Sequence, residues 1–89
     1  MGSKYPVLKP LEIINCLKKF GFEYKSQKGS HVKYVKNNRT TIIPMHDEVA
    51  KGTLKSILEL AGITLEEFLE NLKWNILSDR LALSLQLHI

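Results

Sequence analysis

Two short runs of strand-forming residues, separated by Asn37-Asn38, constrain the fold of this chain more than any other feature. The runs are S-H-V-K-Y-V-K (30–36) and R-T-T-I-I-P (39–44), and both are rich in β-branched or aromatic residues. Asparagine tolerates the positive φ that a tight turn requires, so the spacing predicts a two-residue β-hairpin. The predicted register pairs Lys36 with Arg39, Tyr34 with Thr41, Val32 with Ile43 and His31 with Pro44.

A helix and a further strand are predicted before the hairpin. Residues 10–20 place apolar side chains at positions 11, 14, 17 and 20, with Ile13 beside them. Pro10 suits the first turn of a helix and Gly21 suits its end, so the pattern predicts a helix over 10–20. The segment F-E-Y-K-S-Q (22–27) is consistent with a short strand.

Two helices are predicted after the hairpin. Apolar residues in 54–61 recur at i, i+3, i+4 and i+7, which is typical of an amphipathic helix, and Gly62 is a natural stop. Thr64-x-x-Glu67 is a capping box that would open another helix. The order helix, three strands, helix, helix predicts an α+β fold with helices on one face of an antiparallel sheet.

The length of 89 residues allows one domain with a small core. We expect this domain to span residues 1–72, followed by a C-terminal extension over 73–89. Apolar residues occupy every odd position of L-A-L-S-L-Q-L-H-I (81–89), a period that favours a strand. Such a strand could mediate dimerisation, but a helix and a disordered extension remain open alternatives.

The sequence predicts a cytoplasmic protein that does not associate with membranes. No apolar run approaches the roughly 20 residues of a membrane span, and the N-terminus lacks an apolar signal core. Cys16 is the only cysteine, so an intramolecular disulfide is impossible. Its place in a helical pattern favours a small core residue over a nucleophile.

Positive charge is concentrated in the first half of the chain. Residues 1–40 contain nine lysines and arginines against two acidic residues, whereas residues 41–89 contain four against seven, for a net charge of +4. This asymmetry is consistent with a surface that faces a polyanion such as nucleic acid. A lysine-rich surface that only maintains solubility explains the same charge equally well.

The predicted hairpin places two histidines, His31 and His46, near each other. His46 lies two residues beyond Pro44, so it shares a face with His31 if the strand stays extended. Imidazole exchanges protons near neutral pH, and RNA supplies its own nucleophile, so two histidines and Lys33 are sufficient for metal-independent cleavage. By residue type alone, a surface histidine without function is the commoner case. Zinc ligand spacing is lacking, and no cofactor is predicted.

Three segments resemble one known family. The runs K-G-S-H-V-K-Y-V, T-I-I-P-M-H and K-G-T-L-K-S-I-L-E-L-A-G-I-T-L-E-E-F, within residues 8–72, are similar to the HicA (YcfA-like) family of bacterial mRNA interferase toxins. The resemblance implies a fold like that of double-stranded-RNA-binding domains. It also implies the toxin of a type II toxin–antitoxin system, which cleaves mRNA independently of ribosomes and is neutralised by a HicB antitoxin that covers the active site.

The resemblance places the family's catalytic histidine at His31, behind Gly29-Ser30. His46 matches the family's P-x-H segment and is a possible second catalytic residue. The expected RNA contacts flank this segment and are Lys25, Lys28, Gly29, Ser30, Lys33, Lys36 and Arg39. Tyr24 and Tyr34 could stack on bases, although an aromatic residue in a strand is more often part of the core.

Two other functions remain compatible with the sequence. One is an RNA-binding module of the same fold that has no catalytic activity. The other is a protein-interaction unit that pairs a sheet edge or the period-2 C-terminal segment with a partner strand. Loss of cleavage without loss of RNA affinity on changing His31 would distinguish the enzyme from the binding module.

Overall fold

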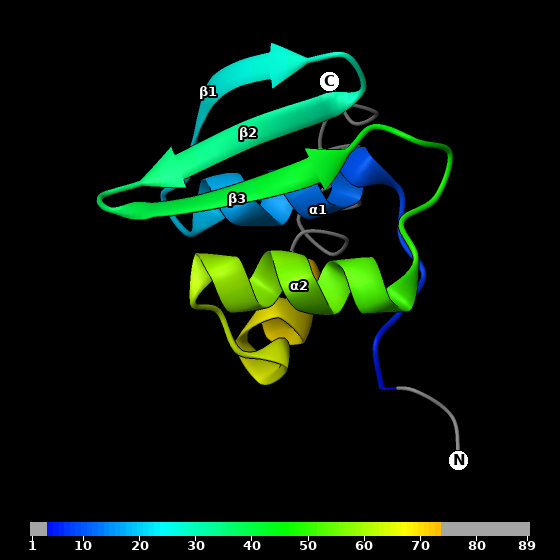
Figure 1. The fold of residues 1–89 in the computed structure, drawn as a ribbon. Helices are drawn as coiled ribbons and strands as arrows, with labels where there is room; N and C mark the ends of the chain where they lie inside the picture. The colour runs from blue at the N-terminus through cyan, green and yellow to red at the C-terminus, as the bar shows by residue number, and fades with distance from the viewer. Residues whose placement is uncertain (1–3, 74–89) are drawn as a thin grey trace, which may run out of the picture.

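The computed structural model describes residues 4–73 and has the predicted α+β architecture. Its elements, in chain order, are α1 (Pro10–Lys19), β1 (Glu23–Lys28), β2 (His31–Lys36), β3 (Arg39–Pro44) and α2 (Lys51–Ala61), followed by a helical segment over 65–73. The three strands form one antiparallel sheet in the order β1-β2-β3. Among the described residues, the helices lie on one face of this sheet and none of them covers the other face (Figure 1).

The hairpin between β2 and β3 has the predicted register. Its pairs are Lys36–Arg39, Tyr34–Thr41, Val32–Ile43 and His31–Pro44. Asn37 has a φ of 54°, which explains why asparagine occupies the turn. Val32 and Tyr34 are buried whereas His31 and Lys33 are exposed, so the alternation of β2 separates an inner face from an outer face.

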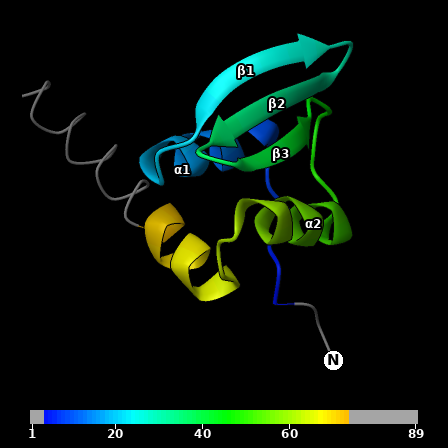
Figure 2. The ribbon, with the colours of Figure 1, turned by 60° about the vertical axis from the view of Figure 1, so that its left-hand side comes forward.

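The core lies between the inner face of the sheet and the helices (Figure 2). Ile13, Ile14, Cys16 and Leu17 of α1 are buried, which confirms Cys16 as a small core residue. Leu11 is 64% exposed, so the expected stripe through positions 11, 14, 17 and 20 is rotated. The buried stripe instead starts at Pro10 and runs through Ile13, Ile14 and Leu17, the i, i+3, i+4, i+7 set one residue earlier.

Left-handed backbone and a capping box join α2 to the helical segment 65–73. Gly62 ends α2 with a φ of 72°, as expected for a helix stop. The Thr64 backbone N–H and hydroxyl both donate to Glu67 Oε1, at 3.0 and 2.9 Å, and the Glu67 N–H donates to Thr64 Oγ1 at 3.1 Å. The hydrogen bond from the Thr64 backbone holds the pKa of the Glu67 carboxyl below its usual value. The predicted capping box is therefore confirmed.

The expected C-terminal extension, 73–89, lies outside the described residues except for Lys73. The possible strand over 81–89 and a dimer formed through it therefore stay predictions. Within residues 4–73, no helix is both long enough and apolar enough to cross a membrane.

Candidate functional site

His31 and His46 come together on the outer side of the sheet, as the register predicts. His31 is the first residue of β2, and His46 follows β3 by two residues. The centroids of the two imidazole rings are 6.3 Å apart, with an interplanar angle of 61°. Both side chains are exposed, so a ligand can reach the two rings from solvent.

Backbone and side-chain hydrogen bonds hold the two histidines in place. Beyond the end of the β2–β3 ladder, the Met45 N–H donates to the Ser30 carbonyl at 2.6 Å. The Ser30 hydroxyl lies 3.4 Å from His46 Nε2, close enough for a weak hydrogen bond. Ser30, which directly precedes His31, therefore also contacts His46.

Gly29 and Ser30 form the two-residue turn between β1 and β2. Gly29 has a φ of 59°, in the left-handed region that favours glycine. A Cβ at this position would meet no atom within 4 Å, so the turn is open to solvent. The glycine is thus required by the turn, and the same open space admits a ligand close to the backbone.

A depression beside this turn carries the basic residues nearest to His31. We call it the lysine pocket, and its volume is ≈ 640 Å³. Its lining residues are Ser26, Lys28, Gly29, Ser30, His31, Lys33 and Ile42. Lys28 pairs with His31 across the two strands, and Lys33 follows His31 on the same face. Positive charge therefore borders one side of the first histidine.

Two further depressions continue from the lysine pocket past the histidines. The central pocket, of ≈ 360 Å³, is lined by both histidines together with Ile42, Pro44, Glu48, Val49, Ala50 and Thr53. The leucine pocket, of ≈ 480 Å³, is lined by Lys9, Pro10, Leu11, Glu12, Met45, His46 and Asp47. His31 is shared by the lysine and central pockets, and His46 by the central and leucine pockets. Each imidazole thus lies between two neighbouring pockets, with the central pocket between the two imidazoles.

Sequence reasoning missed the residues of the central and leucine pockets other than His31 and His46. Glu48 and Leu11 belong to segments that meet only in the folded chain, where Leu8 and Val49 form an isolated antiparallel bridge. Leu11 gave no warning, because the expected stripe through positions 11, 14, 17 and 20 included it among the buried residues, whereas the structure leaves it exposed.

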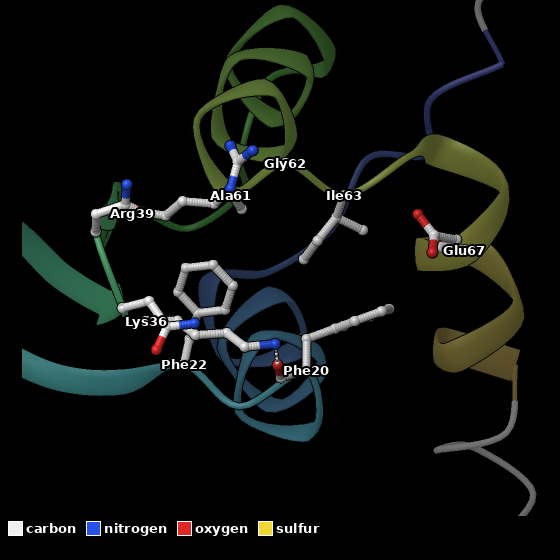
Figure 3. A pocket seen from close by; sticks show the side chains of 10 residues that line it. Phe20, Phe22, Lys36, Arg39, Ala61, Gly62, Ile63 and Glu67 are labelled. Atoms are coloured by element: carbon white, nitrogen blue, oxygen red, sulfur yellow. Dashed lines mark hydrogen bonds between the residues drawn. The ribbon is translucent and has the colours of Figure 1, made fainter.

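The structure does not bring Lys36 and Arg39 to the histidines. They pair with each other at the turn end of the hairpin. This pair lies on the inner face, because Lys36 is two residues from Tyr34 and four from Val32 along β2. The Lys36 ammonium donates to the Phe20 carbonyl at the end of α1, at 2.5 Å, and Arg39 reaches the end of α2 beside Gly62 (Figure 3). The expectation that both cations flank Gly29-Ser30-His31 is therefore wrong in its geometry, and RNA contact by them stays a prediction.

The remaining candidates are also placed. Lys25 is exposed in β1, at the shift of register between Tyr24 and Ser26. Tyr34 is buried in the core, as the commoner interpretation expected, and its pKa is raised by burial and then by the nearby Tyr24. Tyr24 is 58% exposed but packs edge-on against Tyr34, at a centroid distance of 6.1 Å. Since paired residues share a face, neither ring lies on the outer face with His31.

The outer face therefore combines two exposed imidazoles with the ammonium groups of Lys28 and Lys33. Imidazoles can take up and release protons, and lysines can bind a phosphate group as point charges. Among residues 4–73, no group of three or more His, Cys, Asp or Glu side chains is arranged to hold a metal ion. The arrangement is suited to proton transfer on a bound phosphate ester.

Comparison with known proteins finds both a matching family and a named relative. The family profile described as HicA toxin of bacterial toxin-antitoxin matches residues 12–63, more than half of the chain. A relative named "Probable mRNA interferase HicA", from Pseudomonas fluorescens (strain Pf0-1), is 36% identical over 58 residues. That match covers 63% of this chain and 97% of the relative. His31, His46 and the lysine pocket all lie within the matched residues 12–63.

Proposed function

Because this chain belongs to the HicA toxin family of bacterial toxin–antitoxin systems, we propose that it cleaves mRNA with His31 as a proton-transfer catalyst. As an mRNA interferase, the protein is an endoribonuclease, and its partners are an RNA substrate and an antitoxin. The observation that carries the histidine mechanism is the pair of exposed imidazoles 6.3 Å apart beside Lys28 and Lys33.

The proposed reaction is an internal transesterification. One imidazole removes the proton of the ribose 2′-hydroxyl, and the 2′-oxygen forms a bond to phosphorus. The bond from phosphorus to the 5′-oxygen breaks, and the other imidazole donates a proton to the departing oxygen. The products are a 2′,3′-cyclic phosphate and a 5′-hydroxyl, so protons and electrons balance without a co-reactant.

The separation of the rings supports this division of roles. Hydrogen bonds of about 3 Å from each ring can reach different oxygens of one phosphodiester. Ser30 contacts His46 and so limits the orientation of the second ring. Lys33 or Lys28 would offset the negative charge that develops on the phosphoryl oxygens.

The proposed antitoxin is of the HicB type, and it would act by covering the outer face of the sheet. Within the described residues, the helices lie on the opposite face, so the site is open to a protein partner (Figure 2). The same exposure would admit RNA. A single surface could therefore serve substrate and inhibitor in turn.

The chemistry predicts specific ends on the cleaved RNA. Purified protein should cut a long mRNA in the presence of EDTA and leave 2′,3′-cyclic phosphate and 5′-hydroxyl termini. Replacing only the ribose of the cleaved nucleotide by 2′-deoxyribose should stop cutting there, because the nucleophile is removed. Mass spectrometry of the fragments measures both results. Fragments with 3′-hydroxyl and 5′-phosphate ends would show that water attacks instead, and RNA binding without cleavage would favour a catalytically inactive binding module.

The lysine pocket predicts a change in salt dependence. Lys33→Ala should weaken RNA binding and reduce the slope of log affinity against log salt by about 0.7, the contribution of one phosphate contact on single-stranded RNA. Fluorescence anisotropy with an uncleavable 2′-O-methyl RNA, over a range of salt concentrations, measures the slope. Lys36→Ala is the matched comparison, because Lys36 lies on the same strand but on the inner face. An unchanged slope for Lys33→Ala contradicts the proposed contact, whereas a reduced slope for Lys36→Ala shows that RNA also reaches the turn end.

A further inference from the structure

The central pocket lies where a nucleobase next to the cleaved phosphate would fall. Both histidines line it, so a phosphodiester held between the two rings borders directly on this depression. The lysine pocket adjoins it across His31 and supplies cations for the sugar–phosphate backbone. The central pocket differs from the lysine pocket because apolar residues and a carboxylate line it in place of lysines.

The walls of the central pocket match the two surfaces of a base. Ile42, Pro44, Val49 and Ala50 provide apolar contacts for the ring faces. Glu48 and Thr53 provide polar groups that can bind a hydrogen-bonding edge. Apolar walls with a few polar groups are typical of sites that bind and orient a small planar ligand.

The charge of Glu48 indicates which part of RNA the pocket accepts. The residues that line the central pocket include this carboxylate and no lysine or arginine. A carboxylate repels phosphate, so the backbone is favoured in the lysine pocket and the base in the central pocket. The carboxylate only accepts hydrogen bonds when ionised.

A side chain that only accepts hydrogen bonds discriminates between bases. Cytosine and adenine present an exocyclic amino group on the edge that would face Glu48, and guanine presents N–H donors. Uracil presents carbonyl oxygens on both sides of its single N–H, and these oxygens are repelled by a carboxylate. We propose that the central pocket holds the base adjacent to the cleaved phosphate, and that Glu48 selects an amino-bearing base over uracil. This inference rests on the proposed function, because it takes RNA as the ligand of the site.

The proposal can be tested by binding alone, without cleavage. The ligands are the 2′-O-methyl dinucleotides UpU, CpU and UpC, which lack the nucleophile and have one phosphate each. NMR titration measures their affinities, and the amide signals of Val49, Ala50 and Thr53 report on the central pocket. Wild-type protein should bind one of the cytosine-containing ligands roughly fivefold to a hundredfold more tightly than UpU, the range for a good side-chain contact to a base.

The decisive variant is Glu48→Gln, which keeps the size of the side chain but can donate as well as accept. We expect it to bind the three dinucleotides with similar affinity. Glu59→Gln is the matched control, because Glu59 is an exposed residue of α2 outside all three pockets, and it should retain the wild-type preference. The amide spectra of both variants also show whether each is folded.

Three results would overturn the inference. They are equal affinity of wild-type protein for all three ligands, an unchanged preference in Glu48→Gln, or signal changes that avoid the central pocket. Failure of the proposed catalysis gives a different result. In that case the protein binds with the expected preference but does not cut RNA, so the two hypotheses are separable.

Discussion

His31→Ala is expected to slow RNA cleavage by about 10²- to 10⁴-fold, the contribution of a positioned general acid or base. Affinity for uncleavable RNA should change little, because Lys28 and Lys33 remain in the lysine pocket. His31 is exposed at the start of β2, so its truncation leaves no cavity in the core. Single-turnover cleavage in EDTA, RNA binding by anisotropy, and circular dichroism together measure these three properties.

Comparison with other variants separates catalysis from a general disturbance of the sheet. Thr40→Ala changes an exposed position of β3 opposite Val35, away from the histidines, and should leave the rate unchanged. If His31 and His46 act on the same phosphate, the double alanine variant should be only slightly slower than the slower single variant. Equal cleavage by wild type and His31→Ala would show that another group, or a contaminating nuclease, cuts the RNA.

Phe68→Ala is expected to lower the free energy of unfolding by about 3–5 kcal/mol, as for other buried aromatic residues. Phe68 has no exposed surface and belongs to the helical segment 65–73, beyond the residues matched by the family profile. A loss of this size is large for a small domain, whose total stability is about 5–15 kcal/mol. Urea unfolding, followed by circular dichroism, measures the change in midpoint.

The control for this prediction is an exposed residue of the same helical segment. Glu70→Ala removes no buried surface and should change the stability by less than about 0.5 kcal/mol. A loss below about 1 kcal/mol for Phe68→Ala would show that the segment 65–73 contributes little to the core. The expected large loss would instead place this helix within the folding unit.

The β-hairpin was the most predictable part of both fold and site. Asn37-Asn38 fixes the turn, the turn fixes the register, and the register places His31 opposite Pro44. Because the side chains of a strand alternate, this local information was sufficient to bring His46 near His31. The capping box at Thr64 was predictable for a similar reason, since its partners are three residues apart.

Other features could not be obtained from local patterns, or were read incorrectly. The central and leucine pockets depend on how the segments around Leu8 and Val49 meet across the fold. Lys36 and Arg39 were grouped with the histidines by proximity in sequence. Side chains two residues apart on a strand share a face, so the predicted strand already placed Lys36 on the face of Tyr34 and not on that of His31.

The hydrogen bond from Met45 to the Ser30 carbonyl has a consequence for control of the toxin. It extends the backbone ladder past β3, so the sheet brings the backbone of His46 close to that of His31. An antitoxin that covers this exposed surface, as proposed above, would compete with RNA for the same site. Inhibition should therefore follow the ratio of antitoxin to toxin, and activity should return at once when the antitoxin is degraded.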